Sequence, residues 1–113
     1  MKDTLKRLSS KVKNLTKVLD LQKDAIEDVG MLVELPDKRE QATKTLQFVS
    51  TLGECLIIVT GYIDDTVEDM RQKSGYGESH VNMLAKCECD LDELKELVEQ
   101  NAPGLYKSVY ETP

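Results

Sequence analysis

The feature that most constrains this chain is a long repeat of apolar residues at spacings of three and four. Four consecutive heptads of this kind place their apolar side chains on one stripe of an α-helix. The repeat therefore predicts a first helix over about residues 2–31, with a single polar interruption, whose stripe must be buried against other helices. Its members are Leu5, Leu8, Val12, Leu15, Leu19, Gln22, Ile26, Val29 and Val33.

A second helix is predicted over residues 37–73. Pro36 interrupts the first pattern, and Asp37 with Glu40 has the spacing of a capping box at a helix start. Residues 55–63 are apolar on nearly all sides, so we expect several neighbours to enclose them. Their β-branched side chains also permit a buried strand, which stays open as an alternative. The predicted stripe consists of Ala42, Leu46, Val49, Gly53, Leu56, Thr60, Ile63, Val67 and Met70.

A glycine-containing loop near residues 74–78 separates this segment from a third predicted helix, residues 79–101. Ser79 is the expected cap. The apolar phase slips around residues 87–90, and Asp90 with Glu93 has capping-box spacing, so a break in this helix is an open alternative. Pro103 and Gly104 end the helix. The tail, residues 105–113, either packs as a strap through its apolar residues or stays mobile.

These segments predict an all-α fold, an elongated bundle of three main helices with coiled-coil-like heptads. Residues 1–104 form the single expected domain, with 105–113 as its tail. A chain of 113 residues buries a limited share of its surface, so we expect self-association to complete the bundle, as a homo-oligomer. Aromatic residues make up only 4%, which leaves the core to Leu, Val and Ile.

The charge is divided unevenly along the chain. The formal net charge is −6, yet residues 1–23 hold seven Lys or Arg against two Asp and so carry +5. Lys2, Lys6, Lys13 and Lys17 repeat on the outer side of the first helix, where they are candidate contacts for an anion such as nucleic acid or a nucleotide. The same positive charge also suits pairing with the acidic segment 88–99.

The cysteine count, the charged first residues and the short apolar runs predict the cellular compartment. Three cysteines, an odd number, favour a reducing cytoplasm over a disulfide framework. Residues 1–14 carry charges throughout, so we expect no secretory signal there. The longest continuous apolar run falls far short of a membrane span of roughly 20 residues, so no membrane contact is expected.

Two residue clusters are candidate chemical sites. Asp64, Asp65, Glu68 and Asp69 put four carboxylates on adjacent helical turns, an arrangement that can hold Mg²⁺ for phosphate chemistry and that supports a metal-dependent all-α phosphohydrolase as a third hypothesis. The second cluster is His80 with the cysteines Cys55, Cys87 and Cys89, and it lacks the paired spacing of a zinc site. A solvated acidic face, a surface histidine and inert thiols are the default reading, with no metal, cofactor or catalytic residue assigned.

The leading functional hypothesis is a non-enzymatic helical interaction protein, such as an adaptor, an inhibitor or an assembly factor. Leu5, Leu8, Val12 and Leu15 are the predicted interaction residues, because the first half of the first helix is expected to extend beyond the cover of the third. Apolar complementarity would supply binding to a protein partner, and charge would set orientation. The alternative is a binder of an anionic ligand through the Lys-rich first helix or a subunit interface.

Overall fold

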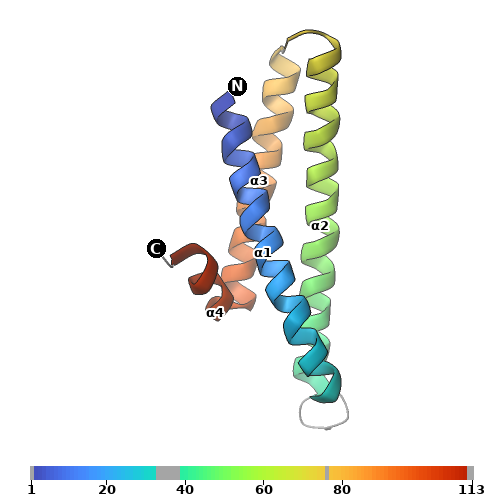
Figure 1. The fold of residues 1–113 in the computed structure, drawn as a ribbon, viewed down its shortest axis with the longest axis vertical. Helices are drawn as coiled ribbons and strands as arrows, with labels where there is room; N and C mark the ends of the chain where they lie inside the picture. Colours follow the sequence, from blue (N-terminus) through green and yellow to red (C-terminus); the bar gives the residue numbers. More distant parts are fainter. Residues whose placement is uncertain (1, 33–38, 76, 112–113) are drawn as a thin grey trace.

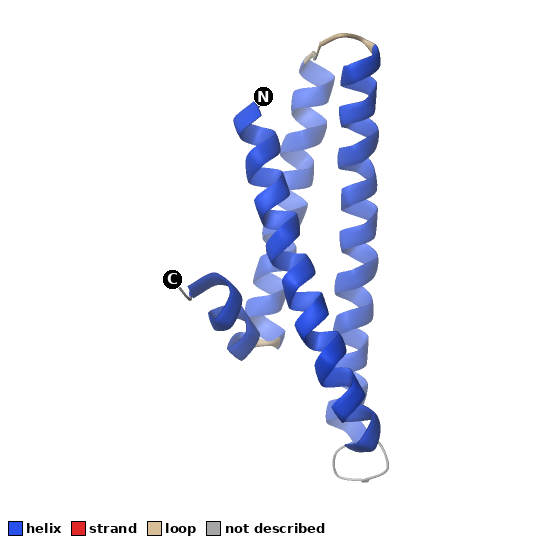
Figure 2. Cartoon of the chain, in the orientation of Figure 1, coloured by secondary structure: helices blue, strands red, loops and turns tan. Residues whose placement is uncertain are grey.

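A computed structural model of the protein shows three long helices with a short C-terminal segment folded back on them (Figure 1). The structure describes residues 2–32, 39–75 and 77–111. The helices are α1 (Lys2–Leu32), α2 (Arg39–Gln72), α3 (Glu78–Asn101) and α4 (Pro103–Tyr106), followed by a π-helical turn, Lys107–Glu111. No strand occurs among these residues (Figure 2), so the predicted all-α bundle is confirmed and the strand alternative for residues 55–63 is wrong.

The bundle is elongated, with extents of 57 × 28 × 18 Å. Helices α1 and α3 run in one direction and α2 runs in the other, so α2 is antiparallel to both neighbours (Figure 1). Asp37 of the predicted capping box and the last apolar positions of the first repeat lie outside the residues whose side chains the structure describes, whereas Glu40 is exposed and lies 3.5 Å from Lys44 Nζ.

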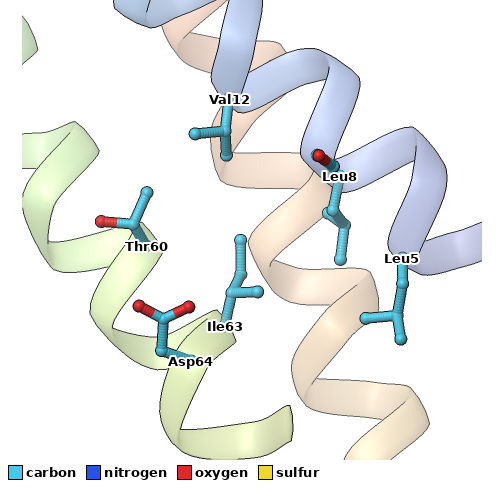
Figure 3. Close-up of a pocket in the computed structure, with 7 residues that line it drawn as sticks. Leu5, Leu8, Val12, Thr60, Ile63 and Asp64 are labelled. Atoms are coloured by element: carbon cyan, nitrogen blue, oxygen red, sulfur yellow. The ribbon is translucent and has the colours of Figure 1, made fainter.

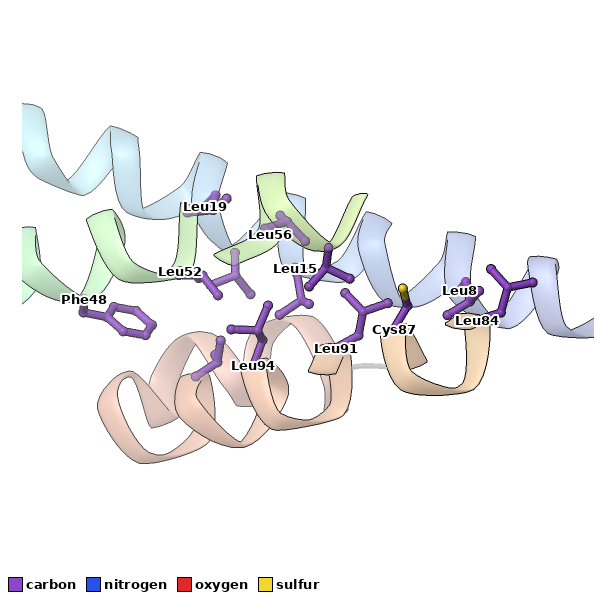
Figure 4. Packing of buried hydrophobic residues seen from close by; sticks show 13 residues of the cluster. Leu8, Leu15, Leu19, Phe48, Leu52, Leu56, Leu84, Cys87, Leu91 and Leu94 are labelled. Atoms are coloured by element: carbon purple, nitrogen blue, oxygen red, sulfur yellow. The ribbon is translucent and has the colours of Figure 1, made fainter. Parts of the chain in front are cut away.

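One hydrophobic core runs between the three helices (Figure 4). In α3 its members recur at spacings of three and four without a slip, because Cys87 fills the position between Leu84 and Leu91. A buried thiol packs as a small apolar group, so α3 is continuous and the predicted break near residues 87–90 is wrong. The core consists of Leu8, Leu15, Val18, Leu19, Phe48, Leu52, Leu56, Val59, Leu84, Cys87, Leu91, Leu94 and Val98.

Helix α2 is rotated relative to its predicted stripe. Phe48, Leu52 and Val59 are buried, whereas Leu46, a predicted stripe residue, is 43% exposed. Residues 55–63 are apolar around most of the helix, so periodicity alone fixes no unique buried side there. Two neighbouring helices cover only part of the circumference of α2, and the expectation that this segment is enclosed on several sides is wrong.

The turn between α2 and α3 is held by His80, which is buried rather than on the surface as predicted. Its Nδ1 accepts a hydrogen bond from the Gly77 backbone N–H at 3.0 Å, and its Nε2 lies 2.6 Å from Asp69 Oδ2. Because Nδ1 accepts a hydrogen bond, the ring proton is on Nε2, which donates a hydrogen bond to Asp69 Oδ2. The ring thus ties the first turn of α3, which starts at Glu78 one residue before the predicted start, to the end of α2.

The C-terminal segment packs as a strap, one of the two predicted alternatives. Leu105, Tyr106, Val109 and Tyr110 are half-buried against the core. The rings of Tyr106 and Tyr110 have centroids 5.0 Å apart, and Lys95 Nζ lies 4.9 Å from the Tyr110 centroid. Tyr110 thereby lines the cleft between α1 and α3 together with Leu15 and Leu91, and the segment lies beside the lower half of α3 (Figure 1).

Candidate interaction surface

The most exposed large apolar side chains of the described chain lie on α2. Ile57 is 72% exposed, Ile58 57% and Tyr62 51%. We call these three residues the α2 apolar face. No charged residue lies between Glu54 and Asp64, so the face is bounded by charge only at its ends. Exposed aliphatic and aromatic side chains gathered on one uncharged stretch are typical of interaction sites.

Ile57 and Ile58 lie on different sides of α2 because successive helical residues diverge by about 100°. Ile57 precedes Thr60 by one turn and Asp64 by two, and both of these line the groove between α1 and α2. Ile58 itself lines the groove between α2 and α3. The α2 apolar face therefore borders both grooves.

The α1–α2 groove is lined by three of the four predicted interaction residues, Leu5, Leu8 and Val12 (Figure 3). It encloses about 210 Å³. Half-buried Leu5 and Val12 project from α1 towards Ile63 of α2, and Asp64 lies at the edge. Their role in partner binding stays a prediction.

Leu8 and Leu15 are not available in the same way, since each is only 1% exposed and belongs to the core. The expectation that the first half of α1 extends beyond the cover of α3 is wrong. The two helices run in the same direction, and Arg7 near the start of α1 reaches Glu88 in the middle of α3. Helix α3 thus covers the beginning of α1.

The basic side of α1 divides into paired and unpaired groups. Arg7 Nε lies 3.0 Å from Glu88 Oε2, and Lys11 Nζ lies 3.1 Å from the same oxygen and 2.7 Å from Asp92 Oδ1. The predicted pairing of α1 with the acidic segment 88–99 is therefore present. By contrast, the four predicted anion contacts are exposed and make no ion pair with any described residue; these are Lys2, Lys6, Lys13 and Lys17.

The α1–α3 ion pairs shift the protonation equilibria of their members. Hydrogen bonds from Arg7 and then Lys11 lower the pKa of Glu88 below its ordinary value. Burial works to lower the pKa of Lys11, but its hydrogen bonds to Asp92 and Glu88 outweigh burial and raise it. Both shifts favour the charged forms, so the network stays ionised at neutral pH.

The α2–α3 groove is the larger of the two grooves beside the α2 apolar face, with a cleft of about 390 Å³. Its walls are apolar except for two carboxylates, Asp90 and Glu93, which make no ion pair with any described residue. A second cleft of about 250 Å³ continues it towards the start of α2 and shares Leu97 with it. The apolar walls of the larger cleft are Cys55, Ile58, Val59, Leu94 and Leu97.

The four predicted metal-binding carboxylates do not converge on one point. Asp69 bonds to His80 and also lies 3.2 Å from Lys73 Nζ, while Glu68 lies 3.5 Å from Arg71. Asp64 lies at the α1–α2 groove instead. The hydrogen bond from His80, followed by that from Lys73, lowers the pKa of Asp69. Over the described residues no three His, Cys, Asp or Glu side chains gather as a metal site.

The three cysteines have different surroundings. Cys87 is buried, and burial raises the pKa of its thiol. Cys55 is half-buried in the α2–α3 groove, and Cys89 is exposed on α3. Each is a free thiol. Sequence reasoning did not place Cys55 in a groove, because that position depends on the rotation of α2.

Comparison with known proteins gives no relative: no family model, curated protein or solved structure matches this chain. In the described part of the chain, one helix has the length and composition of a membrane span, Thr43–Gln72, and 17% of its most apolar window is buried. That helix also supplies Phe48, Leu52, Leu56 and Val59 to the core. The prediction of no membrane contact stays a prediction.

Proposed function

We propose that this chain is a non-enzymatic helical interaction protein that binds another macromolecule through the α2 apolar face and the grooves beside it. The observation that supports this proposal is that the most apolar helical segment, residues 55–63, also contains the most exposed large apolar side chains of the described chain, Ile57, Ile58 and Tyr62. In an ordinary bundle such a segment would be the most deeply covered.

The mechanism is burial of apolar surface. Each aliphatic side chain removed from water contributes roughly 1.5–3 kcal/mol when fully buried, and a few such residues dominate the energy of a typical interface. Ile58 and Tyr62 are one helical turn apart, so one partner element can cover them together, and Ile57 lies about 100° around the helix from Ile58. The charged residues at either end, Glu54 and Asp64, would fix the position of that element.

Site-specific photo-crosslinking tests this function. A photoreactive residue replaces Ile57, Ile58 or, as the control, Glu96, which is exposed on α3. We expect defined adducts from positions 57 and 58 in cells that produce the protein, and none from position 96. Equal adducts from all three positions would contradict the proposal, because they would show that contact follows exposure rather than the α2 apolar face.

Self-association is part of the same proposal. Light scattering coupled to gel filtration, over a range of protein and salt concentrations, measures it directly. We expect an oligomer that weakens when Ile57 is replaced by glutamate and does not weaken for Glu96→Gln. A monomer at every concentration would contradict self-association, and binding to a different protein would then be the remaining form of the proposal.

A second candidate function is binding of an anionic ligand by the lysine row of α1. It is favoured because Lys2, Lys6, Lys13 and Lys17 are exposed and unpaired among the described residues, whereas Arg7 beside them is paired. Binding of a labelled oligonucleotide should fall steeply with salt. Oligonucleotide binding should also weaken in the double variant Lys13→Glu/Lys17→Glu. It should be unchanged in the control variant Ser10→Ala, which alters an exposed position on α1 without changing its charge. Salt-independent binding would argue against phosphate contacts.

A further inference from the structure

The two flanks of α3 provide an internal comparison. The flank facing α1 carries Glu88 and Asp92, and both are met by cations of α1, Arg7 and Lys11. Those cations belong to an amphipathic helix whose apolar residues enter the core on the same side, at Leu8 and Leu15. On this side of α3, a basic amphipathic helix of the same chain therefore pairs with the carboxylates and covers the apolar surface beside them.

The opposite flank of α3 has the same pattern but no helix on it. Asp90 and Glu93 stand at the edge of the 390 Å³ cleft, next to apolar walls from both α2 and α3. Neither carboxylate pairs with a cation in the described chain. Lys86, one turn before Asp90, also makes no ion pair with a described residue, and Lys95, two residues after Glu93, lies over the Tyr110 ring on the α1 side of α3.

The dimensions of this groove suit a helix. The two clefts that share Leu97 extend along α2 from Lys44 to Val59. At 1.5 Å per residue this length is about 22 Å, or roughly four helical turns. The exposed side chain of Ile58 stands at one end of it, where it would contact the occupant.

We infer that the α2–α3 groove is a docking site for a basic amphipathic helix of another protein, which would add a fourth helix to the bundle. This inference rests on the proposed function and names the partner of that surface. The apolar side of the docked helix covers Cys55, Ile58 and Leu97, and its Lys or Arg residues pair with Asp90 and Glu93. The arrangement repeats what α1 does on the other flank of α3.

A second copy of this chain fits the groove poorly. A symmetric contact would place the groove against itself, and Asp90 and Glu93 would then face the same carboxylates across the interface, which is unfavourable. The lysine row of a second α1 has the right charge, but no described residue of α1 is an exposed large apolar side chain, because Leu8 and Leu15 are in the core and Leu5 and Val12 are half-buried against it. The occupant must therefore bring both features on one helix.

The test uses a synthetic helical peptide of about 15 residues with a leucine stripe flanked by lysines, and a matched peptide with glutamates in place of the lysines. Binding to the full chain is followed by fluorescence anisotropy. We expect the lysine peptide to bind and the glutamate peptide not to bind. Asp90→Lys/Glu93→Lys should weaken binding by about tenfold or more. The control Glu78→Lys/Glu96→Lys makes the same change in net charge on the outer side of α3 and should not.

The cysteines give a readout that needs no substitution. Cys55 lines the groove and Cys89 does not, so the bound lysine peptide should slow alkylation of Cys55 while leaving that of Cys89 unchanged. Asp90→Asn/Glu93→Gln, a conservative pair checked for helicity by circular dichroism, should reduce this protection.

Several results would overturn the inference. Equal weakening by the two lysine pairs would show a nonspecific charge effect, and equal binding of both peptides would show that the carboxylates do not select the partner. Absence of peptide binding, or a dimer of the chain that is lost on Ile58→Glu, would also refute it. The proposed function is judged separately, because photo-crosslinked adducts at positions 57 and 58 do not depend on the peptide.

Discussion

Replacement of Leu52 and of Ile57 by alanine separates the covered side of α2 from the uncovered side. Leu52 has 0% exposure, so Leu52→Ala loses the transfer free energy of three carbons, about 0.8 kcal/mol each, and leaves a cavity as well. We expect a loss of about 3–4 kcal/mol in the free energy of unfolding. Ile57 is 72% exposed, so the same deletion removes little burial, and alanine is the better helix former. We expect Ile57→Ala to change the stability by less than about 0.5 kcal/mol.

Urea denaturation followed by far-ultraviolet circular dichroism measures both effects. With a slope of about 1.5 kcal/mol per M, Leu52→Ala should lower the midpoint by roughly 2 M. Ile57→Ala should leave it nearly unchanged. A loss for Ile57→Ala as large as that for Leu52→Ala would refute the reasoning, because it would mean that Ile57 is covered in solution. Dependence of that loss on protein concentration would identify the cover as another copy of the chain.

Three further predictions concern single groups. Gly61→Ala should raise the stability by about 0.5–1 kcal/mol in the same urea assay, because no atom would lie within 4 Å of the added Cβ and alanine favours the helix. The hydrogen bond from His80 lowers the pKa of Asp69 below its ordinary value of 3.8. The stability that this bond contributes should therefore be present above pH 3.8 and be lost as the pH falls further. In urea denaturation at acid pH, Asp69→Asn should lose less stability than the unchanged protein does over the same pH range. Burial raises the pKa of Tyr110 from 10.0 to about 12. The stability gained by burying the neutral phenol should therefore be complete below pH 10 and be lost as the pH rises towards 12. Ultraviolet titration should show phenol ionisation near pH 12, and Tyr110→Phe should lack it.

Helix limits were predictable from the sequence. The predicted ranges 2–31, 37–73 and 79–101 differ by one or two residues from α1, α2 and α3. Apolar spacing, proline and glycine determine those limits locally, so neighbouring helices need not be known. The continuity of α3 was left open because Cys87 was not counted as a core residue, although cysteine packs as a small apolar group.

The candidate surface was not predictable in the same way. The covered side of α2 depends on how the helix is rotated in the bundle, and a segment apolar on all sides such as 55–63 does not encode that rotation. The burial of Leu8 and Leu15 depends on the stagger of α1 against α3. The bond between His80 and Asp69 joins residues eleven positions apart across a turn, and no local pattern signals it.

The neighbouring positions Ile57 and Ile58 can show from which side a partner approaches. The two side chains are identical and both are exposed, yet Ile58 lines the α2–α3 groove, whereas Ile57 lies on the same side of α2 as Thr60 and Asp64, which line the α1–α2 groove. A helix seated between α2 and α3 should therefore give photo-crosslinks mainly from position 58. A partner that covers the α1–α2 groove near the lysine row should give them mainly from position 57. Equal yields from both would require one element lying directly over the outer side of α2, and docking within the α2–α3 groove would then be wrong even if the chain is an interaction protein.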